Sequence, residues 1–223
     1  MMDWSAFALS IQLALGTLAV LLPVGLLVGR WLARTPFKGR TWLEAAILLP
    51  LVLPPTVMGY YLLVALGGAS PVGQWLQNSF GISLTFNFTG LLLASVVFNI
   101  PFMIQPIQRA FESIPVNLNE AAQVSGLSTW AIFTKVELPL AWPGILSAIV
   151  LTFVHTLGEF GVVLMIGGSI PGETRTLAIS IYDSVQSFDL NAANTMSLAL
   201  LVFSLVAVAS SLWLSGRRKR PVQ

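Results

Sequence analysis

The chain contains no cysteine, which excludes a disulfide framework, a thiol nucleophile and a cysteine-based metal site. Charged residues are scarce, because only 9% of the 223 residues are Asp, Glu, Lys or Arg, against about 25% in an average soluble domain. Long polar stretches are missing too: the longest have roughly 20 to 30 residues, too few to fold alone without disulfides or metals. Hydrophobic residues, in contrast, make up 56% of the chain. These features predict a protein whose main solvent is the lipid bilayer.

Five apolar runs are long enough to cross a membrane as helices, which takes about 20 residues for roughly 30 Å of hydrocarbon. The runs cover residues 7–29, 45–66, 89–108, 136–166 and 196–214. The first run carries its basic residues after the apolar part, the reverse of a cleaved signal peptide, so we expect it to be retained. The sequence therefore predicts an all-α membrane protein with about five transmembrane helices, forming one transmembrane domain over residues 1–223.

The basic residues predict the orientation, because Lys and Arg accumulate in short cytoplasmic loops. Placing the N-terminus outside and the C-terminus in the cytoplasm puts ten of the 11 basic residues inside. These are Arg30, Arg34, Lys38, Arg40, Arg109, Lys135, Arg217, Arg218, Lys219 and Arg220. Only Arg175 is then outside, where it could attract an anion, contact a binding protein, or pair with Glu173 or Asp183. Basic residues in short clusters beside apolar runs fit membrane orientation better than a nucleic-acid partner.

Prolines interrupt three of the predicted spans. They are Pro50, Pro54, Pro55, Pro101, Pro106, Pro139 and Pro143. Each proline frees a backbone carbonyl, which inside a membrane must find a partner in another helix or in a water-filled cavity. Two interpretations stay open, namely kinked helices around a polar path and packing alone. The outer segment 173–194 carries scattered apolar residues and is expected to form a short helix in or at the outer membrane face.

The cytoplasmic stretch 109–135 is more patterned than a connector requires. Glu120, Ala121 and Ala122 are followed after three residues by Gly126 and after nine more by residues 136–139, Val-Glu-Leu-Pro. This spacing predicts a short helix with small residues that allow close approach of a partner.

Caps for this short helix are available in the sequence. Asn117 or Asn119 can cap its start, with Glu120 in the first turn, and Gly126 can end it. The alternative to a docking helix is an amphipathic connector held on the membrane surface by apolar side chains. These would be Leu118, Val124 and Leu127.

The spacing resembles the E-A-A, G, I-x-L-P signature of permeases of binding-protein-dependent ABC importers, with Val136 where isoleucine is usual. The resemblance implies a type I ABC-importer permease fold and a motif that couples to a cytoplasmic ATPase. The coupling residues would be Glu120, Ala121, Ala122, Gly126, Leu138 and Pro139. None of the three lysines stands in a phosphate-binding Gly-Lys-Ser/Thr context. We therefore expect a non-catalytic subunit without a cofactor, with ATP and magnesium bound by separate ATP-binding subunits.

Two further stretches resemble permeases for molybdate. They are residues 50–60, which match the second-helix segment, and Gly158-Glu159-Phe160-Gly161 with residues 170–176, which match the end of the fourth helix and the following outer loop. Sulfate permeases carry similar segments, so sulfate and tungstate remain alternatives. The resemblance implies a homodimer in the bacterial inner membrane, served by an extracytoplasmic molybdate-binding protein.

Glu159 is the one acidic residue deep in an apolar run, where an ionisable group indicates function. A fixed carboxylate would repel an oxyanion, and the flanking glycines predict a helix end. Residues Gly158, Glu159, Phe160 and Gly161 are therefore interpreted as a gate or structural brace rather than a substrate ligand. His155 lies one turn earlier, but one His and one Glu are too few for a metal site. A secondary transporter is the alternative class, although ion-coupled carriers normally pair charges inside their spans.

Overall fold

The computed structural model describes residues 1–217, with side chains described as far as Leu214. Every regular element in this part of the chain is helical, which confirms the predicted all-α class. The elements are α1 (Trp4–Arg34), α2 (Arg40–Val52), α3 (Pro55–Leu66), α4 (Pro71–Phe80), α5 (Phe88–Glu112), α6 (Val116–Val124), α7 (Thr129–Ile132), the π-helical turn η1 (Phe133–Glu137), α8 (Leu138–Gly158), α9 (Gly161–Gly167), α10 (Leu177–Gln186) and α11 (Leu190–Arg217). Of the basic residues used for orientation, Arg218, Lys219 and Arg220 lie outside the described residues, as does the side chain of Arg217.

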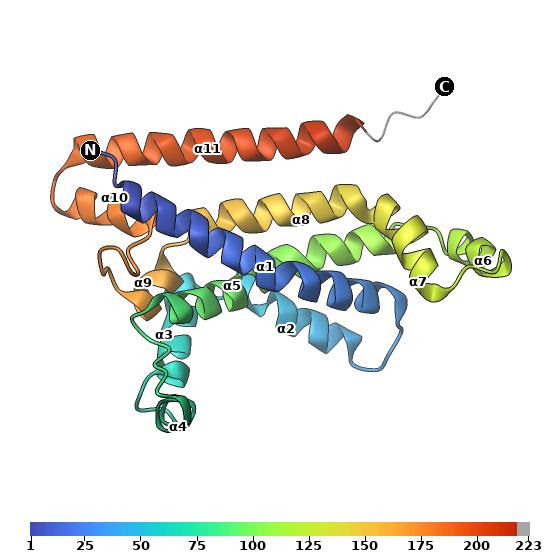
Figure 1. The fold of residues 1–223 in the computed structure, drawn as a ribbon, viewed down its shortest axis with the longest axis horizontal. Coiled ribbons are helices and arrows are strands. Elements are labelled where there is room, and N and C mark those ends of the chain that lie inside the picture. Colours follow the sequence, from blue (N-terminus) through green and yellow to red (C-terminus); the bar gives the residue numbers. More distant parts are fainter. Residues whose placement is uncertain (218–223) are drawn as a thin grey trace.

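Among the described residues, four helical runs are long and apolar enough to cross a membrane, and a bent pair of helices brings the number to five if the pair is one broken span. The four are α1, α5, the run Thr129–Gly158 formed by α7, η1 and α8, and α11. The prediction of about five spans is confirmed. In Figure 1, α1 begins at one end of the bundle and α11 finishes at the other.

The second predicted span, 45–66, is not one straight helix. It divides into α2 and α3, which meet at an angle of 108°. The cause is local, because the residue before a proline avoids the helical conformation, and Leu53 before Pro54 is extended (φ −76°, ψ 139°). Pro55 then starts α3 at a position where a missing N–H costs nothing. By contrast, the helices continue through Pro50 and through the prolines inside α5 and α8.

The fourth predicted span, 136–166, is also displaced. The helical run begins earlier, at Thr129, and ends at Gly158, where the flanking glycines predict a helix end. Glu159 is extended (φ −70°, ψ 128°), and the short helix α9 follows from Gly161. The chain is therefore broken at two places, after α2 and after α8.

Helix α5 is the centre of the bundle and packs against α1 on one side and α8 on another. The shared core is apolar and fully enclosed, and includes Leu21, Met103, Ile107, Phe111, Ala141, Ile145 and Ala148. Glycines let α1 approach α5 closely, since a Cβ atom at Gly29 would lie 2.9 Å from the Ile107 Cγ2 atom. Small residues at helix contacts are the usual means of close packing in membranes.

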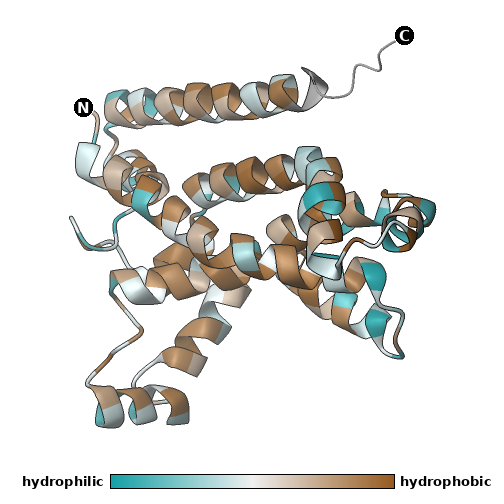
Figure 2. Ribbon diagram, turned by 45° about the vertical axis from the view of Figure 1, so that its right-hand side comes forward, coloured by the Kyte–Doolittle hydropathy of each residue, from teal (hydrophilic) through white to brown (hydrophobic). Residues whose placement is uncertain are grey.

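Helix α11 stands at the edge of the bundle (Figure 1). Only 6% of its most apolar 18-residue stretch is buried, against 56% for the corresponding stretch of α5. Figure 2 shows hydrophobic residues along most of its length. Such a surface is stable only against lipid or another apolar partner. The helix expected in segment 173–194 is α10, whose Leu177 and Ile179 are buried rather than lying free on a membrane surface.

Candidate coupling and translocation sites

Helix α6 lies at the end of the bundle where α1 finishes and α2 begins (Figure 1). Its N-cap is Pro115, and no side chain caps it. The predicted capping by Asn117 or Asn119 is therefore wrong, because the helix starts after Pro115, whose φ is fixed, two residues before Asn117 and four before Asn119. As a consequence, Glu120 lies in the second turn and not in the first.

The predicted end of the helix at Gly126 is confirmed. Gly126 has a φ of +80°, a conformation that disfavours other residues. Its N–H donates to the Gln123 carbonyl at 2.9 Å, and the Leu127 N–H donates to the Ala122 carbonyl at 3.1 Å. These two bonds form a Schellman motif, which stops the helix and turns the chain toward α7.

The surface of α6 is only partly used by this chain. Ala122 is buried, whereas Glu120 and Ala121 are exposed. Val124 is 90% exposed and Val116 is 64% exposed. No other described part of the chain covers these two side chains.

Glu137 connects the α6 loop to the first helix. Its side chain is only 2% exposed and accepts hydrogen bonds from Arg30 Nε at 2.5 Å and from Asn119 Nδ2 at 2.9 Å. Arg34 Nε lies 3.2 Å from the same carboxylate. A buried carboxylate requires such partners, because leaving it alone costs several kcal/mol. The network therefore joins α1, α6 and η1.

Glu137 was not among the predicted functional residues, although it stands inside the 136–139 segment. The available signal was an acid at the edge of an apolar run that follows a cluster of arginines. Of its neighbours in the segment, Leu138 packs against the central core, and Pro139 is exposed in the first turn of α8. The π-helical turn that carries Glu137 ends two residues before Pro139, whose missing N–H interrupts the helical hydrogen-bond ladder at this place.

A buried polar cluster lies where α8 ends. Glu159 is 4% exposed, and its Oε2 atom accepts hydrogen bonds from Asn99 Nδ2 at 3.3 Å and Ser95 Oγ at 3.4 Å, both on α5. The Oε1 atom has no partner. Ser95 also accepts a hydrogen bond from Thr17 of α1 at 3.0 Å. The carboxyl group is therefore hydrogen-bonded to α5 where α8 ends, and Ser95 connects this cluster to α1.

His155 belongs to the same cluster, and its hydrogen-bond partner is Asn99 rather than Glu159. Its Nδ1 atom lies 3.0 Å from Asn99 Oδ1, and its ring stacks on Phe102 with 3.8 Å between ring centroids. Asn99 thus connects His155 and Glu159, and it was not singled out as their common partner from the sequence.

A cavity of about 460 Å³ opens beside this cluster. Its walls include Pro55, Thr56, His155 and residues 158–161, so both chain breaks border it. The breaks touch, because a Cβ atom at Gly161 would lie 2.9 Å from Pro55 Cβ. The volume far exceeds the ~15 Å³ that one water requires. Of the predicted gate residues, Phe160 packs beside Tyr182, with 4.7 Å between ring centroids.

Arg175 lies away from the cavity walls. Its Nε atom donates to Ser169 Oγ at 2.9 Å and lies 3.5 Å from Asp183 Oδ2. Of the two acidic partners that the sequence offered, the structure selects Asp183.

Comparison with known proteins identifies the class. Residues 22–220 match the family described as "Binding-protein-dependent transport system inner membrane component". The chain belongs to this family and is a permease subunit of the ABC-importer type, a multi-pass inner-membrane component. This assignment replaces the alternative of a secondary transporter.

The relatives of this chain include permeases named for molybdenum transport and for sulfate transport. The molybdenum transport permease ModB of Azotobacter vinelandii is 44% identical over 97% of this chain and 96% of its own. The ModB of Haemophilus influenzae is 37% identical over 98% of this chain and 96% of its own. The sulfate permease CysT of Escherichia coli K12 is more distant, with 34% identity over 89% of this chain and 71% of its own.

Solved structures support the fold. A bacterial ABC transporter for the import of alginate superposes with a TM-score of 0.78 and 21% identity, over 97% of this chain and 79% of that chain. The methionine transporter MetNI gives 0.69 and 19%, over 97% and 94%. Together with the helical architecture described above, these neighbours confirm the predicted type I ABC-importer permease fold.

Proposed function

We propose that the chain is the membrane subunit of an ATP-driven molybdate importer. The observation that carries the cargo assignment is the 44% identity to a molybdenum permease over nearly the full length of both chains. Sulfate is the second candidate, favoured by the relationship to CysT at 34% identity. Tungstate shares the charge and tetrahedral shape of molybdate and is tested alongside it.

The proposed ATPase contact is α6. Glu120 and Ala121, which are exposed, would contact the partner, whereas the buried Ala122 would hold α6 on the permease. Gly126 would fix the exit of the chain, and Leu138 and Pro139 would carry movement into α8. The exposed valines of α6 support a protein partner at this place. The hydrogen bonds of Glu137 to Asn119 and Arg30 would also transmit movement of α6 directly to α1. Nucleotide and magnesium would be bound by the partner, because the chain has no P-loop.

The proposed path runs past the cavity at the two chain breaks. The polar side chains on the cavity wall include the neutral hydroxyl of Thr56, a donor that can replace water around an anion without holding it tightly. Residues Gly158, Glu159, Phe160 and Gly161 would act as gate or brace. Two copies of the chain would form one path at their interface, loaded from outside by a molybdate-binding protein.

Transport in vesicles tests the proposal. The chain would be reconstituted with its ATPase and binding protein, with ATP on the ATPase side, and uptake of molybdate, tungstate and sulfate compared. We expect ATP-dependent uptake of molybdate to exceed that of sulfate. Preferred uptake of sulfate would refute the cargo assignment, and equal uptake without ATP would refute the importer mechanism.

A further inference from the structure

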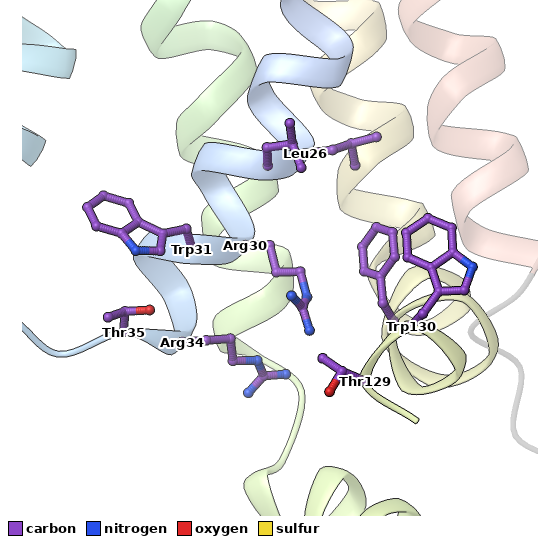
Figure 3. A pocket seen from close by; sticks show the side chains of 9 residues that line it. Leu26, Arg30, Trp31, Arg34, Thr35, Thr129 and Trp130 are labelled. Carbon is purple, nitrogen blue, oxygen red and sulfur yellow. The ribbon is translucent and has the colours of Figure 1, made fainter. Parts of the chain in front are cut away.

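A second cavity, of about 420 Å³, opens between the end of α1 and the α7–η1 turn. Figure 3 shows Arg30 and Arg34 of α1 reaching toward Thr129, with Trp130 beside it and Leu26 above. The walls come from α1 and from the turn, and no residue of α6 is among them. It is therefore distinct from the proposed ATPase contact and from the cavity at Glu159.

The charged wall of this cavity has a surplus of positive charge. Arg30 and Arg34 share one carboxylate, that of Glu137, so the cluster carries a net charge of +1. The Nη2 atom of Arg34 is buried and has no hydrogen-bond partner. Guanidinium groups prefer planar, charge-assisted hydrogen bonds to carboxylate or phosphate oxygens. The two arginines therefore have one positive charge that no carboxylate in the cluster neutralises.

The remaining wall is apolar and open to the outside of the bundle. Leu27 is 73% exposed, Trp31 44% and Trp130 71%. Tryptophan at the end of a transmembrane helix marks the level of the lipid headgroups. A cavity with two arginines beside an apolar surface, at the level of the lipid headgroups, is suited to an amphiphilic molecule rather than to a soluble ion.

We propose that this cavity binds one acidic phospholipid of the cytoplasmic leaflet. The phosphate would lie against Arg30 and Arg34, with the Thr129 hydroxyl as a further donor, and an acyl chain would cover Leu27. Basic pockets between helices on the cytoplasmic side are known to hold anionic headgroups. The lipid would connect α1 to α7 from outside, at the same arginines that hold Glu137 and through it α6.

Native mass spectrometry of the detergent-solubilised chain tests this directly. We expect phosphatidylglycerol to be retained about five- to tenfold more than phosphatidylcholine with the same acyl chains. Arg34→Gln should remove this preference. Arg109→Gln is the matched control, because it removes an arginine at the same end of the bundle that is 72% exposed and lies outside the cavity, and it should keep the preference.

Two further measurements test the apolar wall of the cavity and the need for an acyl chain on the ligand. Because Arg34→Gln also removes a neighbour of Glu137, the Leu27→Ser variant tests the acyl wall without touching that network, and it should lower retention of both lipids. Glycerol 3-phosphate, which is a headgroup without chains, should not displace the lipid at millimolar concentration. Equal binding of the two lipids by the unchanged chain, retention of the preference in Arg34→Gln, unchanged retention in Leu27→Ser, or displacement by glycerol phosphate would each overturn the proposal.

Discussion

Replacing Glu137 by Gln is expected to destabilise the protein at the junction between α1 and the α6 loop. The carboxylate is 2% exposed, whereas the side chains of Arg30 and Arg34 are 31% and 22% exposed. Removing one partner of a fully buried ion pair costs about 3–5 kcal/mol. Because both arginines retain some access to water, the cost here should be smaller, about 2–3 kcal/mol. The amide keeps an oxygen that can accept from Asn119, so the loss reports mainly on charge.

The assay is thermal unfolding of the purified chain in detergent, with uptake and ATPase activity of the reconstituted transporter measured in parallel. By the scaling of soluble proteins of this size, 2–3 kcal/mol corresponds to about 4–12 °C in Tm. We also expect uptake per ATP hydrolysed to fall, because the route from α6 to α1 is cut. Glu112→Gln is the control, since its contacts with Arg40 and Arg109 involve more exposed side chains and should contribute about 1 kcal/mol or less. Equal Tm values for the two variants would refute the reasoning.

Three further predictions concern single positions. Gly126→Ala should strain the end of α6 by about 1 kcal/mol and weaken ATPase co-purification, whereas Gly81→Ala, with a similar φ of +68° far from α6, should be equally strained but leave co-purification intact. Gly161→Ala should lower Tm because its Cβ would lie 2.9 Å from Pro55, whereas Gly158→Ala, with nothing within 4 Å, should leave Tm unchanged. For Asp3, desolvation raises the pKa, but hydrogen bonds from the Ala6 N–H and from Ser5 and Ser180, with the charge of Arg175, lower it below its ordinary value. A carboxyl group whose pKa is lowered by folding stabilises the folded state at pH values above its unfolded-state pKa. The Tm difference between wild type and Asp3→Asn should therefore be constant near neutral pH and should disappear as the pH falls below about 4.

Local signals predicted much of this fold. Apolar runs predicted the spans, because a chain segment in lipid has to satisfy its backbone groups internally and the length needed is fixed by the bilayer. Gly126 predicted the end of α6, since a positive φ is a property of one residue. The start of α6 was predicted wrongly because the sequence holds two kinds of helix-start signal close together. The helix begins after Pro115, so the asparagines that could have capped it lie inside the helix.

The angles between helices and the contacts between residues far apart in the chain could not be predicted from the sequence. Pro54 and Pro55 predict an interruption, but the 108° between α2 and α3 depends on which surfaces the two helices meet after the break. The partners of Glu137 on α1 lie 107 and 103 residues away in the chain, and only folding places them together. The same holds for Asn99, an ordinary polar residue in an apolar run until α8 brings His155 and Glu159 to either side of its amide.

The two buried carboxylates allow a last prediction, because their environments are opposite. Glu137 has two arginines, whereas Glu159 is held by Asn99 and Ser95 at 3.3 and 3.4 Å, and no salt bridge to it occurs among the described side chains. A buried group without a counter-charge gains nothing from being charged. Glu159→Gln should therefore keep or raise Tm, and Glu159→Ala should lower it by removing the brace.

Uptake then separates the two roles proposed for residues 158–161. If Glu159 only braces α8, Glu159→Gln transports molybdate at close to the wild-type rate, because an amide can accept from Asn99 and Ser95 in the same way. If Glu159 gates the path through its acidity, uptake is lost although Tm is retained. A fall in Tm as large as that expected for Glu137→Gln would contradict the reasoning, since it would mean that a charge stabilises the end of α8 as it does the α6 junction.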